Sequence, residues 1–379
     1  MGPARGLWVV EPAAIGPVPF ACMMPAGLGA DVVRVDRAER ARPFAPGHRV
    51  LDRGRRSVAL DLRSGPVVEA LLRLVERSDV LVGGFRPGVA ERLGVGPEQC
   101  AARNPGLVHV RVTGWGQDGP LSGARGHDIN DIALSGALHA FGGVGGPLVG
   151  PVDLLGDFAG GGLLLVVGVF VVLHEGQRSG LGQVVDAAVA DGSAAVFGML
   201  MGMAGAGQWP EGRGRNLLDG GALFYGVCAC ADGGHVAVGA LEERFSRALL
   251  AGLGLDGEAL GDRGDPARWP GLRARFAERF ASRTRDRWAE ALRGHRGLCV
   301  PGAHHRGGRR PCAPRGAGHL PPGGECAGAR PAPRFTRTAA VFPGPAPQPG
   351  GHAREVPAGC GRAPEEIVGR PRGLLTAAG

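Results

Sequence analysis

A histidine and an aspartate, His127 and Asp157, stand 30 residues apart, each beside a glycine. His127 precedes apolar residues at roughly helical spacing, and Asp157 precedes the apolar run 163–173, so a helix is expected to begin at each. Alone, such an aspartate is usually a helix cap, and such a histidine is usually a hydrogen-bonded structural residue. Together they could supply one acid and one base to a single carbon atom. The choice between these interpretations depends on the helices and strands that position the two residues.

Charge along the chain is uneven. The 379 residues are 44% hydrophobic, enough for two domains with a sizeable core, and the formal net charge is +8. Residues 296–379 hold 12 Arg and 4 Glu, which accounts for the whole excess and leaves the first 295 residues formally neutral. A formally neutral main part of the chain lacks the basic surface that binds a nucleic-acid phosphate backbone, so no nucleic-acid partner is predicted.

The eight cysteines are scattered, and the pair Cys228 and Cys230 has no second cysteine pair at ligand spacing. We therefore expect reduced thiols, no metal site and a cytoplasmic location. The N-terminus has no apolar signal core. The run 163–173 is well short of the ~20 residues that cross a membrane, so it is predicted to be a buried helix, without a membrane partner.

Short apolar strands alternate with helices in the first part of the chain. This alternation predicts an α/β fold whose large domain holds a parallel, Rossmann-like sheet. Strands are expected at 7–10, 31–35, 57–62, 79–82 and 107–112. No G-x-G-x-x-G follows the first strand, so no dinucleotide cofactor is expected.

The later part of the chain predicts a smaller α+β domain. A helix is expected over about 187–203 and a hairpin over 223–239, with Asp232-Gly233-Gly234 as its turn. Further helices are expected from about 244, from 266 and around 286–292.

Arginines are expected at the carboxyl ends of the predicted strands, where open α/β sheets bind ligands. They are Arg37, Arg55, Arg56, Arg86 and Arg92. Several arginines at one edge suit a ligand with several phosphates, although any one alone is usually a solvated surface residue.

Six ordered motifs within residues 5–295 resemble those of the α-methylacyl-CoA racemases in the class III CoA-transferase superfamily. They are GADVVRVDR at 29–37, FRPG at 85–88, TGWGQ at 113–117, GHDIN at 126–130, GDF at 156–158 and AVGALE at 237–242. Six motifs in one order are far more specific than any one of them. The resemblance implies a large Rossmann-like domain, a smaller domain, and two chains interlocked as a homodimer.

The resemblance also implies roles for individual residues. His127 and Asp157 match the catalytic pair of the racemases, and Glu242 matches a third active-site carboxylate. The positions that match substrate- and CoA-binding residues are Arg37, Arg56, Ala59, Arg86, Arg92, Gly126 and Asp128. The implied reaction is epimerisation of a 2-methylacyl-CoA thioester at C2, without a metal or organic cofactor.

Inversion at a carbon next to a thioester requires one proton to leave one face and another to arrive on the opposite face. His127 and Asp157 would share one proton, and burial would raise the pKa of the aspartate. Backbone N–H groups after Asp157 are expected to stabilise the enolate oxygen. Two alternatives stay open. A class III CoA-transferase would use Asp157 as an acyl-carrying nucleophile, although such enzymes typically lack the histidine. An inactive homologue would only bind acyl-CoA.

The sequence departs from the family pattern in places. Asp131, one turn after His127, stands where an aromatic or apolar residue is usual, and Pro25 interrupts a normally regular helix. After Leu298 an Arg-, Gly- and Pro-rich segment begins, which a pair of compensating frameshifts or a disordered linker would explain. The predicted boundaries are 1–185 for the large CoA-binding domain, 186–220 for a helical linker, 221–295 for the small domain, 296–330 for this aberrant segment and 331–379 for a C-terminal return segment.

Overall fold

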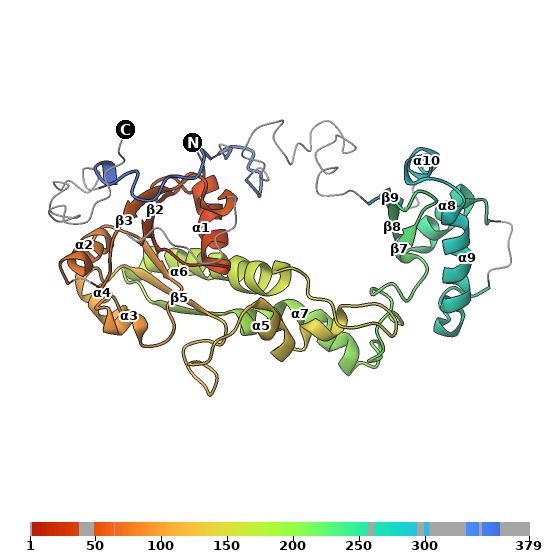
Figure 1. Ribbon diagram of the computed structural model, residues 1–379, viewed down its shortest axis with the longest axis horizontal. Helices are drawn as coiled ribbons and strands as arrows, with labels where there is room; N and C mark the ends of the chain where they lie inside the picture. The colour runs from red at the N-terminus through yellow and green to blue at the C-terminus, as the bar shows by residue number, and fades with distance from the viewer. Residues whose placement is uncertain are drawn as a thin grey trace. The chain divides into compact units, whose positions relative to one another are not determined.

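The computed structural model describes residues 2–37, 49–63, 65–256, 261–293, 299–302, 331–340 and 343–356 (Figure 1). The chain divides into two compact units. The first contains the described residues of 1–135, 151–196 and 318–379, and the second contains those of 136–150 and 197–317. The second unit therefore also includes residues 136–150, which precede the small domain predicted at 221–295.

A six-stranded parallel sheet forms the centre of the first unit, in the order β3-β2-β1-β4-β5-β6. This is the strand order of the Rossmann fold, in which the crevice beside the first strand is the usual ligand site. The strands are β1 (Trp8–Pro12), β2 (Asp31–Asp36), β3 (Arg56–Ala59), β4 (Val80–Gly83), β5 (Val108–Thr113) and β6 (Val184–Ala188). The predicted α/β class with a parallel Rossmann-like sheet is confirmed.

The sixth strand was not predicted. Residues from 182 were expected to lead directly into a helix, but β6 pairs with β5 from Val184 opposite His109 to Ala188 opposite Thr113. Because β6 is an edge strand, its side chains are half-buried or exposed until Ala188. It therefore lacks the continuous apolar run of an inner strand such as β4.

Helices cover both faces of the sheet (Figure 1). Successive strand residues point to opposite faces, so Val9 packs in one apolar cluster with α1 and α6, and Val10 packs in the other with α2. The helical segments of this unit are η1 (Val50–Asp52), α1 (Pro17–Gly27), α2 (Gly65–Val75), α3 (Val89–Arg92), α4 (Pro97–Arg103), α5 (Asp128–Leu134), the π-helix η3 (Leu154–Leu163) and α6 (Leu164–Ser179), while α7 (Val189–Gly205) continues into the second unit.

The apolar segment around α6 is longer than predicted. Together, η3 and α6 make a continuous helix, Leu154–Ser179, which is the one helix in the described residues long and apolar enough to cross a membrane by length and composition. One face of it packs on the sheet through Leu165, Val169 and Val172. The prediction of a buried helix is therefore right for that face only.

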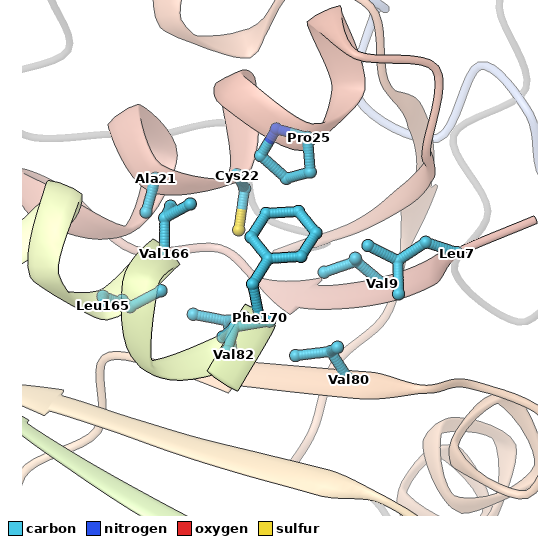
Figure 2. A pocket seen from close by; sticks show the side chains of 11 residues that line it. Leu7, Val9, Ala21, Cys22, Pro25, Val80, Val82, Leu165, Val166 and Phe170 are labelled. Carbon is cyan, nitrogen blue, oxygen red and sulfur yellow. The ribbon is translucent and has the colours of Figure 1, made fainter. Parts of the chain in front are cut away.

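Pro25 lies near the end of α1 and does not break it. A small apolar cavity of about 20 Å³ lies beside it, where α1, the sheet and α6 meet (Figure 2). Cys22 and Phe170 reach this cavity from α1 and α6, above Val9 and Val80 of the sheet. A cavity with an apolar lining offers water no hydrogen-bond partner, so it is a dry packing defect and not a substrate site.

The second unit holds a three-stranded antiparallel sheet in the order β7-β8-β9, packed against helices. Its core includes Trp269, Phe276, Phe280 and Trp288. The elements are η2 (Ala137–Ala140), β7 (Tyr225–Ala229), β8 (His235–Gly239), α8 (Glu243–Leu253), η4 (Pro266–Arg268), α9 (Trp269–Ala281), α10 (Arg285–Ala291) and β9 (Cys299–Pro301). The predicted hairpin and smaller α+β domain are confirmed, and β9 is an addition to them.

Residues 343–356 return to the first unit beside β3. The Ser57 N–H donates to Nδ1 of His352 over 3.1 Å, and the His352 N–H donates back to the Ser57 carbonyl oxygen over 2.9 Å. The Gly350 N–H donates to Ser57 Oγ over 2.9 Å, and Val356 is fully buried in the cluster that contains Leu71.

Most of the proposed frameshift segment, 303–330, lies outside the described residues.

Candidate active site

His127 is the N-cap of α5, where the sequence predicted that a helix begins. Its backbone N–H donates to Oδ1 of Asn130 over 3.1 Å, which closes the first turn. Its ring Nδ1 lies 2.6 Å from the carbonyl oxygen of Gly126. Because a carbonyl only accepts, Nδ1 carries a proton, and the neutral ring keeps the lone pair on Nε2. The exposed ring of His127 can therefore take a proton at Nε2.

Asp157 lies in the first turn of η3, and the residue that caps this π-helix is Asp153, with φ 61°. The Phe158 N–H donates to the Asp153 carbonyl oxygen over 3.1 Å, the five-residue step of a π-helix. The prediction that Asp157 itself begins the helix is therefore wrong, because the π-helix starts earlier. The Phe158 N–H, one of the donors expected to face an enolate, is already engaged.

Asp128 links the segments that carry His127 and Asp157. It follows His127 directly in the chain, and its Oδ1 accepts the backbone N–H of Asp157 over 2.8 Å. The Asp128 side chain is buried and also accepts a hydrogen bond from the Gly156 N–H. The resemblance assigned Asp128 to substrate binding, which stays a prediction, and the structure adds that its carboxylate holds the start of η3. Residue spacing gives no signal for this bond, because its partner is a backbone group 29 residues away.

Glycines let η3 pack closely on its neighbours. A Cβ atom on Gly160 would fall 2.6 Å from the backbone nitrogen of Ser193 in α7. A Cβ atom on Gly162 would fall 2.6 Å from the ring of Phe20, which stacks on Phe158 with ring centroids 4.6 Å apart. The glycine-rich motif after Asp157 therefore serves close packing against α1 and α7.

The side chain of Asp157 rests against the start of α1. A Cβ atom built on Gly16, the N-cap of α1, would fall 2.3 Å from Oδ2 of Asp157. Gly16 has φ 68° and ψ −121°, a conformation that other residues rarely adopt. The positive end of the α1 dipole thus lies beside the carboxyl group of Asp157.

Electrostatics around Asp157 favour its protonated form. Burial is the largest cause, followed by the negative charges of Asp128, Asp153 and Asp131, and together they raise its pKa to about 7, while His127 acts in the opposite direction. A carboxyl group with such a raised pKa can give or take a proton near neutral pH.

Asp131 is a further acid in the same cluster. It lies in α5, its side chain is 2% exposed, and its Oδ1 has no hydrogen-bond partner. A Cβ atom on Gly114, at the end of β5, would fall 2.6 Å from this oxygen. Burial, then the charge of Asp128, raises the pKa of Asp131 to about 6. The sequence marked this residue only as a departure from the family pattern.

Three of the predicted arginines are exposed and near the carboxyl edge of the sheet. Arg37 follows β2, Arg86 follows β4, and Arg92 ends the short helix α3. Within the described part of the chain, none of the three forms an ion pair. Ala59 ends β3 at the same edge, opposite Asp36 of β2.

Two other arginines are not part of that group. Arg55 is buried and its Nη1 lies 2.8 Å from Oε2 of Glu11, so it neutralises a core carboxylate. Arg56 opens β3, and its Nε donates over 2.9 Å to Oδ1 of Asp31, the first residue of β2. The expectation that both arginines lie at the carboxyl edge is wrong, because β3 starts at Arg56 and does not end there.

Glu242 belongs to the second unit, where it is exposed and caps α8. Gly126 supplies the carbonyl oxygen that orients the His127 ring. Over the residues that the structure describes, no group of three or more His, Cys, Asp or Glu side chains is arranged to hold a metal ion.

Known proteins share this fold and sequence. A CAIB/BAIF family protein from Brucella suis superposes with a TM-score of 0.81, at 24% identity, over 95% of this chain and 99% of that chain. The model of CoA-transferase family III matches residues 5–352, and this chain belongs to that family. It is 40% identical over 371 residues to the α-methylacyl-CoA racemase of Mus musculus, covering 96% of this chain and 95% of that protein. It is 41% identical over 301 residues to the racemase of Homo sapiens, covering 78% and 77%. The resemblance inferred from the motifs is confirmed.

Proposed function

We propose that this chain is an isomerase that epimerises 2-methylacyl-CoA thioesters at C2. The observation that carries the proposal is the pairing of an aspartate whose pKa is raised to about 7 with a histidine whose Nε2 is free. His127 caps α5 and Asp157 lies in the first turn of η3, and the hydrogen bond from the Asp157 N–H to Asp128 connects these two helix starts. Such a pair can act as one base and one acid on opposite faces of a carbon atom.

The reaction would proceed in two proton transfers. Nε2 of His127 takes the proton from C2, and the electron pair of the C–H bond moves to the thioester carbonyl oxygen to form an enolate. The enolate collapses as C2 takes the proton of the Asp157 carboxyl group from the opposite face. The reverse direction starts from ionised Asp157 and protonated His127, so the two residues share one proton. No metal or organic cofactor is needed for these transfers.

Acyl transfer through Asp157 is the competing chemistry. A carboxylate nucleophile must be ionised to attack a thioester. With a pKa of about 7, Asp157 has both charge states available near neutral pH, so its ionisation does not separate the two reactions. The presence of His127, which class III CoA-transferases typically lack, favours proton transfer over formation of an acyl-aspartate.

The CoA part of the substrate would lie along the carboxyl edge of the sheet. Arg37, Arg86 and Arg92 leave three cationic groups near this edge for the phosphates of CoA. Ala59, at the end of β3, would contribute backbone contacts there.

We also propose that the chain works as a homodimer. Val167, Phe170 and Val171 of α6 are 55%, 39% and 61% exposed, and Val184 of the edge strand β6 is 47% exposed. Val167, Phe170 and Val171 share one face of α6 by their i, i+3, i+4 spacing, and an exposed apolar helix face usually marks an interface. The five described cysteines are free thiols, which supports a reducing, cytoplasmic setting.

Proton exchange at C2 tests the proposed function. One epimer of a 2-methylacyl-CoA is incubated with the protein in D2O, and deuterium at C2 and the epimer ratio are followed. Exchange with epimerisation, lost in His127→Ala and in Asp157→Ala, is the expected result. Absence of exchange in a protein that still binds CoA contradicts it, and an acyl-transfer assay then separates a transferase from an inactive binder.

A further inference from the structure

Glu242, which the motifs match to a third active-site carboxylate, is held by its backbone and not by its side chain. It is the exposed N-cap of α8, but its carboxylate accepts no capping hydrogen bond. In the described part of the chain that carboxylate also forms no ion pair. Glutamate is not among the residues that favour the N-cap position. The direction of this carboxylate therefore depends on what fixes the backbone on either side of it.

Arg263 contacts the chain on both sides of Glu242. Its Nη1 donates to the carbonyl oxygen of Ala240 over 3.3 Å, and its Nη2 donates to the carbonyl oxygen of Leu241. Its Nε lies 3.0 Å from Oε2 of Glu243. The two carbonyl groups follow the end of β8, where the strand ladder no longer supplies donors. A planar guanidinium group can satisfy both of them at once, because its N–H groups form a rigid fork.

Arg263 is itself fixed by aromatic residues of the second unit. Its carbonyl oxygen accepts the ring N–H of Trp269 over 2.8 Å. Its guanidinium group lies over the ring of Phe224, 4.5 Å from the ring centroid, and both aromatic residues are buried in the core of this unit. The Phe224 carbonyl oxygen accepts the Ala240 N–H over 2.7 Å. The arginine and the segment before Glu242 are therefore attached to the same core residue.

We propose that Arg263 is a positioning residue that fixes the direction of the Glu242 carboxylate for epimerisation. The proposal rests on the proposed function and on the match of Glu242 to a third active-site carboxylate. Glu242 has φ −75° and ψ 144°, and its carbonyl oxygen accepts the N–H groups of Phe245 and Ser246, each over 3.0 Å. Arg263 thus holds the backbone before this extended residue, and the first turn of α8 holds the backbone after it. Loss of either constraint would let the carboxylate leave its catalytic orientation.

Arg247 supplies a matched control for Arg263. Its Nε lies 2.9 Å from Oε1 of Glu243, the other oxygen of the carboxylate that pairs with Arg263, and its side chain is 77% exposed. Replacement of either arginine by Met therefore removes one ion pair to Glu243. Only Arg263→Met also removes the hydrogen bonds to the segment before Glu242.

The first test measures epimerisation by Arg263→Met and Arg247→Met, each alone and combined with Glu242→Gln. Arg263→Met alone should lower kcat by about tenfold, and it should have little further effect in the Glu242→Gln chain, because it acts through that carboxylate. Arg263→Lys keeps the charge without the fork and should remain well below wild type. Arg247→Met should stay within about twofold of wild type. Additive effects of Arg263→Met and Glu242→Gln would overturn the proposal.

Amide hydrogen exchange tests the same contacts without activity. The N–H groups of Phe245 and Ser246 report on the position of the Glu242 carbonyl oxygen that they contact. They should exchange about fivefold faster in Arg263→Met than in wild type, and at the wild-type rate in Arg247→Met. Unchanged exchange in Arg263→Met would overturn the proposal. Faster exchange in Arg263→Met, together with a wild-type chain that lacks epimerase activity, would support the positioning of Glu242 and reject the proposed function separately.

Discussion

The Oδ1 atom of Asp128 accepts the backbone N–H of Asp157 over 2.8 Å, so the residue next to the histidine fixes the backbone of the aspartate. This hydrogen bond therefore connects the two helix starts of the site. A carboxylate that holds a catalytic backbone in place affects turnover more than binding, because its geometry matters most in the transition state.

Replacement of Asp128 by Ala should lower kcat for epimerisation by about 10²-fold, since a displacement of about 1 Å can cost that much. Asp128→Asn keeps an oxygen that can accept the Asp157 N–H, and it should retain most of the activity. Titration calorimetry with CoA should give Kd values within about threefold of wild type for both. A large loss of CoA affinity with unchanged kcat would instead assign Asp128 to substrate binding.

Gly16→Ala should damage both folding and catalysis. The added Cβ would meet Oδ2 of Asp157 at 2.3 Å, and φ 68° is strained for alanine. We expect a loss of about 1–2 kcal/mol in the free energy of unfolding and a fall of at least about tenfold in kcat.

Gly6→Ala is the matched control for this variant. Gly6 has φ 91°, but a Cβ there has no atom within 4 Å. The Gly6→Ala variant should therefore show the backbone strain without the loss of kcat. Equal kcat in the two variants would show that Gly16 does not position Asp157.

Asp131→Asn should change how stability depends on pH. In the folded chain burial raises the pKa of Asp131 from its ordinary value of 3.8 to about 6. The unfolded chain loses this proton first, so stability falls as the pH rises from about 4 to about 6 and stays reduced above that. Asp131→Asn does not lose stability in this way. Its free energy of unfolding relative to wild type should therefore increase by about 2 kcal/mol between pH 4 and pH 7.5.

Urea unfolding at several pH values measures that advantage. Asp118→Asn, at an exposed aspartate, serves as the control and should follow the wild type throughout. A pH-independent difference between Asp131→Asn and wild type would mean that Asp131 ionises as readily in the folded chain as in the unfolded one.

The sequence predicted those features that depend on local pattern. Buried strands such as Val80–Gly83 have continuous apolar runs, and His127 has the apolar periodicity of a helix start behind it. Edge strand β6 has no such run, and its partner β5 is about 75 residues away in the chain, so only the folded sheet defines it. The π-helix start at Leu154 escaped prediction because sequence periodicity does not distinguish a π turn from an α turn.

The same limit applies to the site. Motifs identified His127 and Asp157, but the roles of Asp128 and Gly16 depend on contacts between segments far apart in the chain. Arg55 and Arg56 were grouped with the ligand-binding arginines by type, and only their partners, Glu11 and Asp31, separate them.

The return segment 343–356 should be an integral part of the first unit. Val356 is fully buried with Leu60 and Leu71, and residues 350–352 form three hydrogen bonds with Ser57 of β3. Val356→Ala should lower the free energy of unfolding by about 1–2 kcal/mol through the lost core contacts. His352→Ala should cost about 1 kcal/mol, because the Ser57 N–H then loses its acceptor.

Thermal and urea unfolding of these two variants measures the contribution of the return segment. Asp118→Ala, at an exposed aspartate outside the return segment, should stay within about 0.5 kcal/mol of wild type. A chain that ends at residue 330 should be less stable than either single variant, since it loses the buried valine and the hydrogen bonds together. If instead that shortened chain unfolds at the same urea concentration as the full chain, residues 331–356 do not contribute to the stability of the folded unit.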